Sequence, residues 1–297
     1  MKRSGGSLAT GGLLLVALGW LTVSGCATWL KLQTDLAVVP MVSEMVSKAS
    51  DAENLRVVKE GMPTNIVMLT ALAKISPDNR RLLKDCAFLY CAYGMMVENE
   101  DAEYAAQLYA NGRQYGMDAL KTDTRFRKGL EAGRPLPELV EYLDEDYAEA
   151  LSWTGICSGL WILRNMDDVT ALVRLVDALA LVKRSIELDE DYFFGMGKAF
   201  LGAYYAQVPE SLGTGGGPAA SRKMFAEARA VTDGKLLLVD VYEARFLLSQ
   251  IKDREGYVAT LEKVLEADPD ILKGGRAFTA MAKVKARYFL EHRKEYF

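Results

Sequence analysis

Apolar residues recur at steps of three and four along most of the chain, whereas strict alternation of polar and apolar residues is rare. This spacing places apolar side chains on one face of an α-helix and predicts helices rather than strands. Turn-forming residues interrupt the pattern at 61–63, 76–78, 100–101, 133–135, 165–168, 189–191, 213–217, 232–234 and 269. An amphipathic helix cannot bury its apolar face alone, so residues 38–297 are predicted to form one all-α domain of stacked helical hairpins.

Two pairs of predicted helices carry the spacing of a tetratricopeptide hairpin, in which small residues stand beside large aromatic ones. The first pair matches at Leu83, Cys86, Ala87, Tyr90, Ala105, Tyr109 and Gly112, and the second at Leu201, Gly202, Tyr205, Ser221, Phe225 and Ala228. Small residues let two helices cross closely, while aromatic rings fill the space beside the crossing. The matches are irregularly spaced, and they predict a tetratricopeptide-like superhelix of degenerate repeats.

The stretch GTGGGPAASRK at 213–223 is the densest glycine cluster in the chain. A phosphate-binding Walker loop ends in Gly-Lys-Ser/Thr, but Pro218 and Ala219 stand at those positions. The third glycine of the dinucleotide-binding motif would also fall on Pro218. Proline suits the first turn of a helix, and Gly217 precedes it in the N-cap position. We therefore predict a turn inside a helical hairpin and no nucleotide site.

The N-terminal 25 residues have the organisation of a signal peptide. Lys2 and Arg3 precede the apolar stretch Leu13–Leu21, which is too short to cross a bilayer as a helix. The stretch leads into VSGC at 23–26, which resembles the lipobox of bacterial lipoproteins. The resemblance implies cleavage before Cys26 and acylation of that residue. The alternative is an ordinary signal peptide with an incidental cysteine.

The lipobox implies three segments: a signal peptide over residues 1–25, a lipid anchor and tether over 26–37, and the helical domain over 38–297. Acyl chains on Cys26 would hold the mature protein on a membrane. Ala27 rather than aspartate follows the cysteine, which by resemblance to sorting in bacteria with two membranes favours the outer membrane. The expected location is therefore the periplasm.

Composition excludes several function classes. The chain has 36 Lys and Arg against 40 Asp and Glu, so no basic surface for a nucleic-acid partner is expected. Cys86, Cys91 and Cys157 lie among apolar neighbours and are interpreted as core residues rather than as redox or metal sites. His292 is the one histidine, and it lies in a charged tail without the partner that nucleophilic catalysis needs. We expect no catalytic residue, no metal and no cofactor.

With these residues in place, the chain resembles the TRAP-transporter-associated T components, known as the TatT family of tetratricopeptide-like periplasmic lipoproteins. The resemblance runs from about residue 65 to the C terminus. It rests on these stretches: ISPDNRRLLKDCAFLYCAYG, AAQLYANGRQYGMDAL, DYAEALSWTGICSGLWILRN, SIELDEDYFFGMGKAFLGAYYAQVPESLGTGGGPAASRKMFAEA and LEADPDILKGGRAFTAMAKVKARYFL. Each motif alone is weak, and their order makes the resemblance specific.

The resemblance implies a non-enzymatic transport accessory. Members of the family are thought to bind the extracytoplasmic solute-binding protein, or P component, of a TRAP transporter and to assemble as homotrimers. They are also thought to have ligand channels through the helical fold, so a small, hydrophobic ligand is expected here. The alternative function is a tetratricopeptide scaffold lipoprotein that holds other proteins during envelope assembly.

Five residues are candidates for lining a ligand channel. Trp153 and Trp161 are eight positions apart and project from nearly the same face of a predicted helix. Core packing is the alternative role for both. Tyr204 and Tyr205 could place hydroxyl groups at the channel mouth. Arg113 belongs to the family-like GRQY stretch and is a candidate for a buried or interfacial ion pair.

Overall fold

The structure is a computed structural model, and it describes residues 28–49, 51–52, 54–212 and 215–297. Within these ranges the chain forms helices and no strand. The principal helices are α2 (Val39–Ala49), α3 (Leu55–Ile75), α4 (Arg80–Val97), α5 (Ala102–Leu120), α6 (Thr124–Glu131), α7 (Leu136–Leu139), α8 (Ala148–Arg164), α9 (Val169–Val173), α10 (Leu175–Leu188), α11 (Tyr192–Gln207), α12 (Pro218–Val231), α13 (Leu238–Tyr242), α14 (Arg254–Glu266) and α15 (Arg276–Glu291). The predicted all-α fold is confirmed.

Two π-helical segments and several short 3-10 turns complete the fold. The π-helices are η1 (Thr34–Val38), which runs directly into α2, and η5 (Glu243–Leu248), which follows α13. Residues 28–33 before η1 are α-helical, so the segment assigned to a tether is helical from Thr28 onward. The signal peptide, Cys26 and Ala27 lie outside the described residues.

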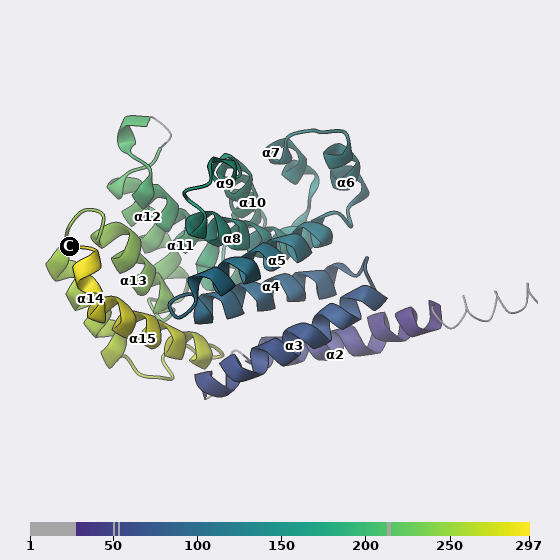
Figure 1. Cartoon of the computed structure of the whole chain (residues 1–297), viewed down its shortest axis with the longest axis horizontal. Helices are drawn as coiled ribbons and strands as arrows, with labels where there is room; N and C mark the ends of the chain where they lie inside the picture. The colour runs from purple at the N-terminus through teal and green to yellow at the C-terminus, as the bar shows by residue number, and fades with distance from the viewer. Residues whose placement is uncertain (1–27, 50, 53, 213–214) are drawn as a thin grey trace, which may run out of the picture.

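The helices form a curved array in which neighbours along the chain pack as hairpins (Figure 1). The pairs α4 with α5, α5 with α8, α8 with α10 and α11 with α12 make the most extensive contacts. The last helix, α15, returns to contact α3, so the two ends of the array meet. Several turns place an Asn or Asp at the N-cap, as Asn79 does for α4 and Asp101 for α5, where the side chain accepts a backbone N–H bond.

The small residues of the predicted hairpins stand at the helix crossings. A Cβ atom on Gly112 of α5 would lie 3.1 Å from the carbonyl oxygen of Ala87 on α4, and one on Gly202 of α11 would lie 2.9 Å from the ring of Phe225 on α12. The Ser221 hydroxyl donates a 2.8 Å hydrogen bond to the carbonyl oxygen of Gly202. The hairpin prediction is therefore confirmed at both pairs.

Residues 215–217 of the glycine cluster lie in the turn that leads into α12. Gly217 is the N-cap of α12 with φ 105°, Pro218 is its first residue, and the Gly217 N–H donates a 2.9 Å bond to the carbonyl oxygen of Tyr205. A Cβ atom on Gly217 would lie 2.1 Å from the side chain of Glu210. Both the positive φ and the close contact require glycine. The predicted turn is confirmed for the described residues of the cluster.

Candidate functional site

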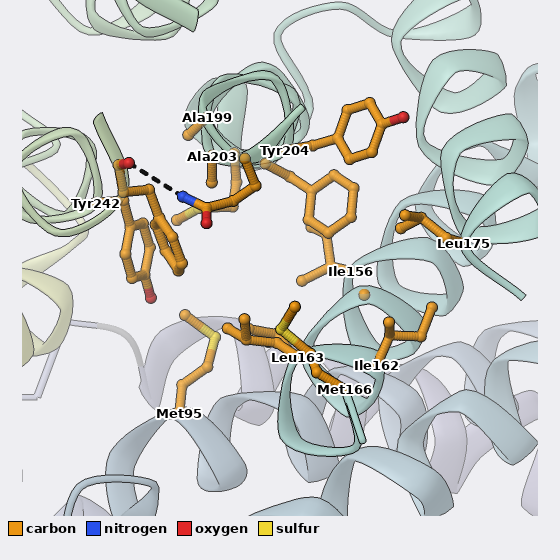
Figure 2. Close-up of a pocket in the computed structure, with 16 residues that line it drawn as sticks. Met95, Ile156, Ile162, Leu163, Met166, Leu175, Ala199, Ala203, Tyr204 and Tyr242 are labelled. Atoms are coloured by element: carbon orange, nitrogen blue, oxygen red, sulfur yellow. Dashed lines mark hydrogen bonds between the residues drawn. The ribbon is translucent and has the colours of Figure 1, made fainter. Parts of the chain in front are cut away.

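An apolar cavity of about 150 Å³ lies between α8 and α11 (Figure 2). Its lining residues are Met95, Ile156, Gly159, Leu160, Ile162, Leu163, Met166, Leu175, Met196, Ala199, Phe200, Ala203, Tyr204, Gln207, Tyr242 and Phe246. They come from α4, α8, α10, α11, α13 and η5, with Met166 just after α8. Met166 and Gln207 are exposed, so the cavity meets solvent on their side.

Small residues on α8 and α11 create the space. Residues 196, 199, 200, 203, 204 and 207 recur at steps of three and four, so one face of α11 forms a wall of the cavity. Ala199 and Ala203 on this face fill little volume. Gly159 on α8 lets the Phe200 ring approach closely, because a Cβ atom there would lie 2.1 Å from that ring. The cavity is thus produced by the same close helix packing that builds the hairpins.

Few polar groups reach the cavity. The Gln207 side-chain amide donates a 3.1 Å hydrogen bond to the carbonyl oxygen of Phe246, which satisfies that donor (Figure 2). The Tyr242 hydroxyl is buried without a hydrogen-bond partner among the described residues. Burial, together with the negative charge of Glu98, raises the pKa of Tyr242 well above its ordinary value. Tyr242 is therefore a neutral donor, and the rest of the lining suits an apolar ligand.

A buried ion cluster lies near Tyr242 of the cavity lining. The Glu98 carboxylate pairs with the Lys285 ammonium of α15 and, at 2.7 Å, with the Arg164 guanidinium of α8, and it accepts a 2.9 Å bond from the Tyr109 hydroxyl. Burial alone would raise the pKa of Glu98, but the two cations outweigh it and lower the pKa to about 2. The cluster holds α4, α8 and α15 together beside the Met95 and Tyr242 positions.

Of the five channel candidates, Tyr204 lines this cavity, whereas Trp153, Trp161, Tyr205 and Arg113 are not among its lining residues. Tyr204 lies at the edge of the cavity across from Tyr242 (Figure 2). The centroid of the Tyr205 ring is 5.4 Å from that of the Tyr204 ring. The carbonyl oxygen of Tyr205 accepts the hydrogen bond from the Gly217 N–H in the turn before α12.

Trp153 and Trp161 have separate surroundings although they share α8. Trp153 is buried, its ring centroid lies 4.6 Å from that of Phe193, and its indole N–H donates a 2.8 Å bond to the Tyr192 hydroxyl. Trp161 is half-buried, with the Arg113 guanidinium 5.8 Å from its ring centroid. Arg113 therefore makes a cation–π contact with this ring.

A second concavity, of about 960 Å³, has a charged lining and an aromatic floor. Trp153, Phe88, Phe193, Phe194 and Phe278 contribute aromatic surface, and two acidic stretches, 144–149 and 189–191, reach its rim. Three of the rim carboxylates are paired: Asp146 with Arg80 at 3.0 Å, Glu149 with Lys84 at 2.6 Å and Asp191 with Lys198 at 3.5 Å. Carboxylates still outnumber cationic side chains among the residues that line the concavity.

The floor contains a backbone turn that the sequence did not suggest. Phe193, Phe194 and Gly195 have φ of 47°, 60° and 76°, so the three residues that follow Tyr192 in α11 lie in the left-handed region. Such a conformation is strained for phenylalanine. Aromatic packing holds it, since the Phe193 ring contacts the rings of Trp153 and Phe278 at centroid distances of 4.6 and 5.1 Å.

The remaining reactive residues have structural surroundings. Cys86, Cys91 and Cys157 are buried free thiols, as the sequence indicated. The His292 ring stacks on Tyr288 at the end of α15, and its Nδ1 lies 2.8 Å from the Tyr288 carbonyl oxygen. Over the described ranges, no group of three or more His, Cys, Asp or Glu residues could hold a metal ion, and no helix there is long and apolar enough to cross a membrane.

Most of the residues that line the cavity are not among the candidates predicted from the sequence; Met95, Ala199, Phe200 and Tyr242 are examples. The available signal was the second face of α11, where small and aromatic residues recur at steps of three and four.

Two comparisons with known proteins bear on the identity of the chain. No curated protein matches it. The family model of the TRAP transporter T-component matches residues 51–297, which include every residue that lines the cavity. The chain therefore belongs to the TRAP transporter T-component family.

Proposed function

We propose that this protein is a periplasmic lipoprotein accessory of a TRAP transporter that binds the transporter's solute-binding protein and helps to bind or pass a small, hydrophobic ligand. The observation that carries the proposal is the family match over 51–297 together with an apolar cavity inside the matched region. The protein would act by binding alone, without enzymatic chemistry, and as a homotrimer.

The cavity between α8 and α11 is the proposed ligand site. Its volume of about 150 Å³ equals that of apolar cavities that admit a benzene-sized molecule. The lining would bind through apolar contact, and the unpartnered Tyr242 hydroxyl offers one donor for a polar group at the inner end of the ligand. Tyr204, across from Tyr242, would stand near the entrance.

Filling the cavity tests this site. Ala203→Phe places a ring into the space between α8 and α11, whereas the matched Ala226→Phe adds the same ring to the exposed face of α12. Fluorobenzene serves as an apolar probe, and ¹⁹F NMR measures its binding to residues 27–297. We expect Ala203→Phe to abolish the binding and Ala226→Phe to retain it. Equal binding by both folded variants would place the probe elsewhere and contradict the assignment.

Attachment to a membrane is the second part of the proposal. Signal-peptide cleavage before Cys26 would leave a diacylated or triacylated cysteine, and Ala27 favours the outer membrane as the destination. Cell fractionation of Cys26→Ser, followed by intact mass measurement, tests it. We expect the variant to move from the membrane to the soluble periplasmic fraction and to lose the mass of the acyl chains. Tight membrane attachment of Cys26→Ser would rule out the lipobox interpretation.

A further inference from the structure

The helix at the start of the described chain, residues 28–45, exposes a continuous row of large apolar side chains. They are Trp29, Leu30, Leu32, Leu36, Met41 and Met45, with exposed fractions from 49% for Leu30 to 69% for Leu36. Isolated exposed apolar residues are common, but a row of this length along one helix indicates a surface that something covers. We call this row the N-terminal apolar face.

The π-helix η1 aligns the two halves of this face. A π-turn adds one residue to an α-helix, so it rotates all later positions by about 100°. With this rotation, Met41 and Met45 fall within about 60° of Trp29, on the same side of the helix. Without it they would point toward the side of Thr34, which is buried against the body together with Val39 and Val42.

The first four turns of this face, as far as position 43, are free of charge. Lys31 and Asp35 are the charged residues between positions 28 and 43. Both turn toward the body: Lys31 pairs with Asp35 at 3.1 Å and with Asp78 at 2.9 Å, and Asn79 donates a 2.6 Å bond to the Asp35 carboxylate. The two charges therefore fasten the helix to the turn before α4. The outward side presents apolar and uncharged polar groups as far as the exposed ion pair between Glu44 and Lys48, 3.5 Å apart, at the end of the helix.

We propose that the N-terminal apolar face lies on the lipid bilayer and sets the orientation of the whole domain on the membrane. The inference rests on the proposed lipid anchor, because Cys26 stands three residues before Trp29 and within about 11 Å of it even with the chain fully extended. An anchor at that point brings Trp29 to the level of the headgroups, where tryptophan is favoured.

The length of the face decides the orientation. Residues 28–45 extend about 27 Å as a helix, so a helix standing upright on the anchor would hold Met45 far from the lipid and leave most of the face in water. A helix lying parallel to the bilayer buries all of it at once, as interfacial amphipathic helices do. The helix lies along one edge of the helical array (purple in Figure 1).

The test supplies the anchor artificially, so that it does not depend on acylation of Cys26. Residues 27–297 carry a hexahistidine tag before residue 27 and are held on phosphatidylcholine vesicles that contain a nickel-chelating lipid. An environment-sensitive NBD label is attached at Met41→Cys or, as the control, at Val284→Cys on α15, where the residue is 49% exposed. The three native cysteines are buried and remain unlabelled.

On vesicles, we expect the label at position 41 to shift its emission to the blue and to lose quenching by iodide, while the label at 284 stays in water. Leu36→Asp places a charge on an exposed position of the face and should abolish the shift, whereas Val284→Asp should not. A water-like label at 41 on vesicles overturns the proposal. Equal shielding of that label without vesicles, in a protein that sediments as an oligomer, would instead assign the face to a contact between copies. Because residues 27–297 lack Cys26, the outcome of the Cys26→Ser experiment does not affect this measurement. The lipid anchor and the membrane-bound face can therefore be contradicted independently.

Discussion

Glu98 and Lys285, which are 187 residues apart, form an ion pair with both side chains buried. Glu98 ends α4 in the first hairpin, and Lys285 lies in α15, the last helix. The pair therefore closes the helical array at a point next to the proposed ligand cavity, and Arg164 of α8 shares the same carboxylate.

Lys285→Met should destabilise the fold strongly. The substitution leaves the buried Glu98 carboxylate with Arg164 as its remaining cation, and loss of one partner from a buried pair costs about 3–5 kcal/mol. Urea unfolding followed by circular dichroism measures the loss. Arg56→Ala is the control, because the Arg56–Glu60 pair is exposed and should leave the unfolding free energy unchanged. Equal effects of the two substitutions would contradict the structural role of the buried pair.

Acid should weaken the same cluster. The pKa of Glu98 is about 2 in the folded protein against an ordinary value of 4.5. A lowered folded-state pKa stabilises the fold above pH 4.5, and this contribution, on the order of 3 kcal/mol, is lost as the pH falls from 4.5 toward 2. Unfolding free energies of the wild type and Glu98→Gln, measured between pH 7 and 3, should converge as the pH falls. Parallel curves would show that Glu98 has no such linkage.

Helix crossings should respond to a single methyl group. In Gly112→Ala the new Cβ would lie 2.8 Å from the Cys157 sulfur and 3.1 Å from the Ala87 carbonyl oxygen, so overpacking should cost about 1–3 kcal/mol. Gly61→Ala within α3 has no atom within 4 Å of its Cβ and should stabilise the protein by up to about 1 kcal/mol. We therefore expect thermal unfolding to show a lower melting temperature for Gly112→Ala and a higher one for Gly61→Ala than for the wild type. An unchanged melting temperature for Gly112→Ala would show that α4 and α5 are not closely packed at this crossing.

The three buried cysteines should be unreactive in the folded protein. Burial raises the pKa of Cys86 to about 12 and also raises that of Cys91, which keeps both as thiols at neutral pH. With residues 27–297, we expect Ellman's reagent to detect no thiol in buffer and all three in urea. Rapid reaction of one thiol in buffer would indicate that its helix opens readily.

The hairpins could be predicted from the sequence because their signals are local. Small and aromatic residues at fixed spacing gave the α4–α5 and α11–α12 crossings, and Pro218 after Gly217 gave the turn between the second pair. The left-handed turn at Phe193 and Phe194 had no comparable signal, since that conformation depends on packing against residues far away in the sequence.

The candidate site could be predicted less well. Trp153 and Trp161 share a helix face by spacing, but α8 is surrounded by α4, α5, α10 and α11, so one face meets different neighbours at its two ends. The cavity is lined from six elements, and the Glu98–Lys285 pair joins α4 to α15 across 187 residues of the chain. Such features follow from the stacking of the whole array, which helix periodicity does not determine.

Binding to the solute-binding protein of a TRAP transporter is the central claim of the proposed function. Residues 27–297 should be mixed at micromolar concentration with the TRAP solute-binding protein of the same organism and followed by sedimentation velocity. We predict a faster-sedimenting complex that contains both proteins, and a trimer for the chain alone. Independent sedimentation of the two proteins at these concentrations would contradict the proposed function.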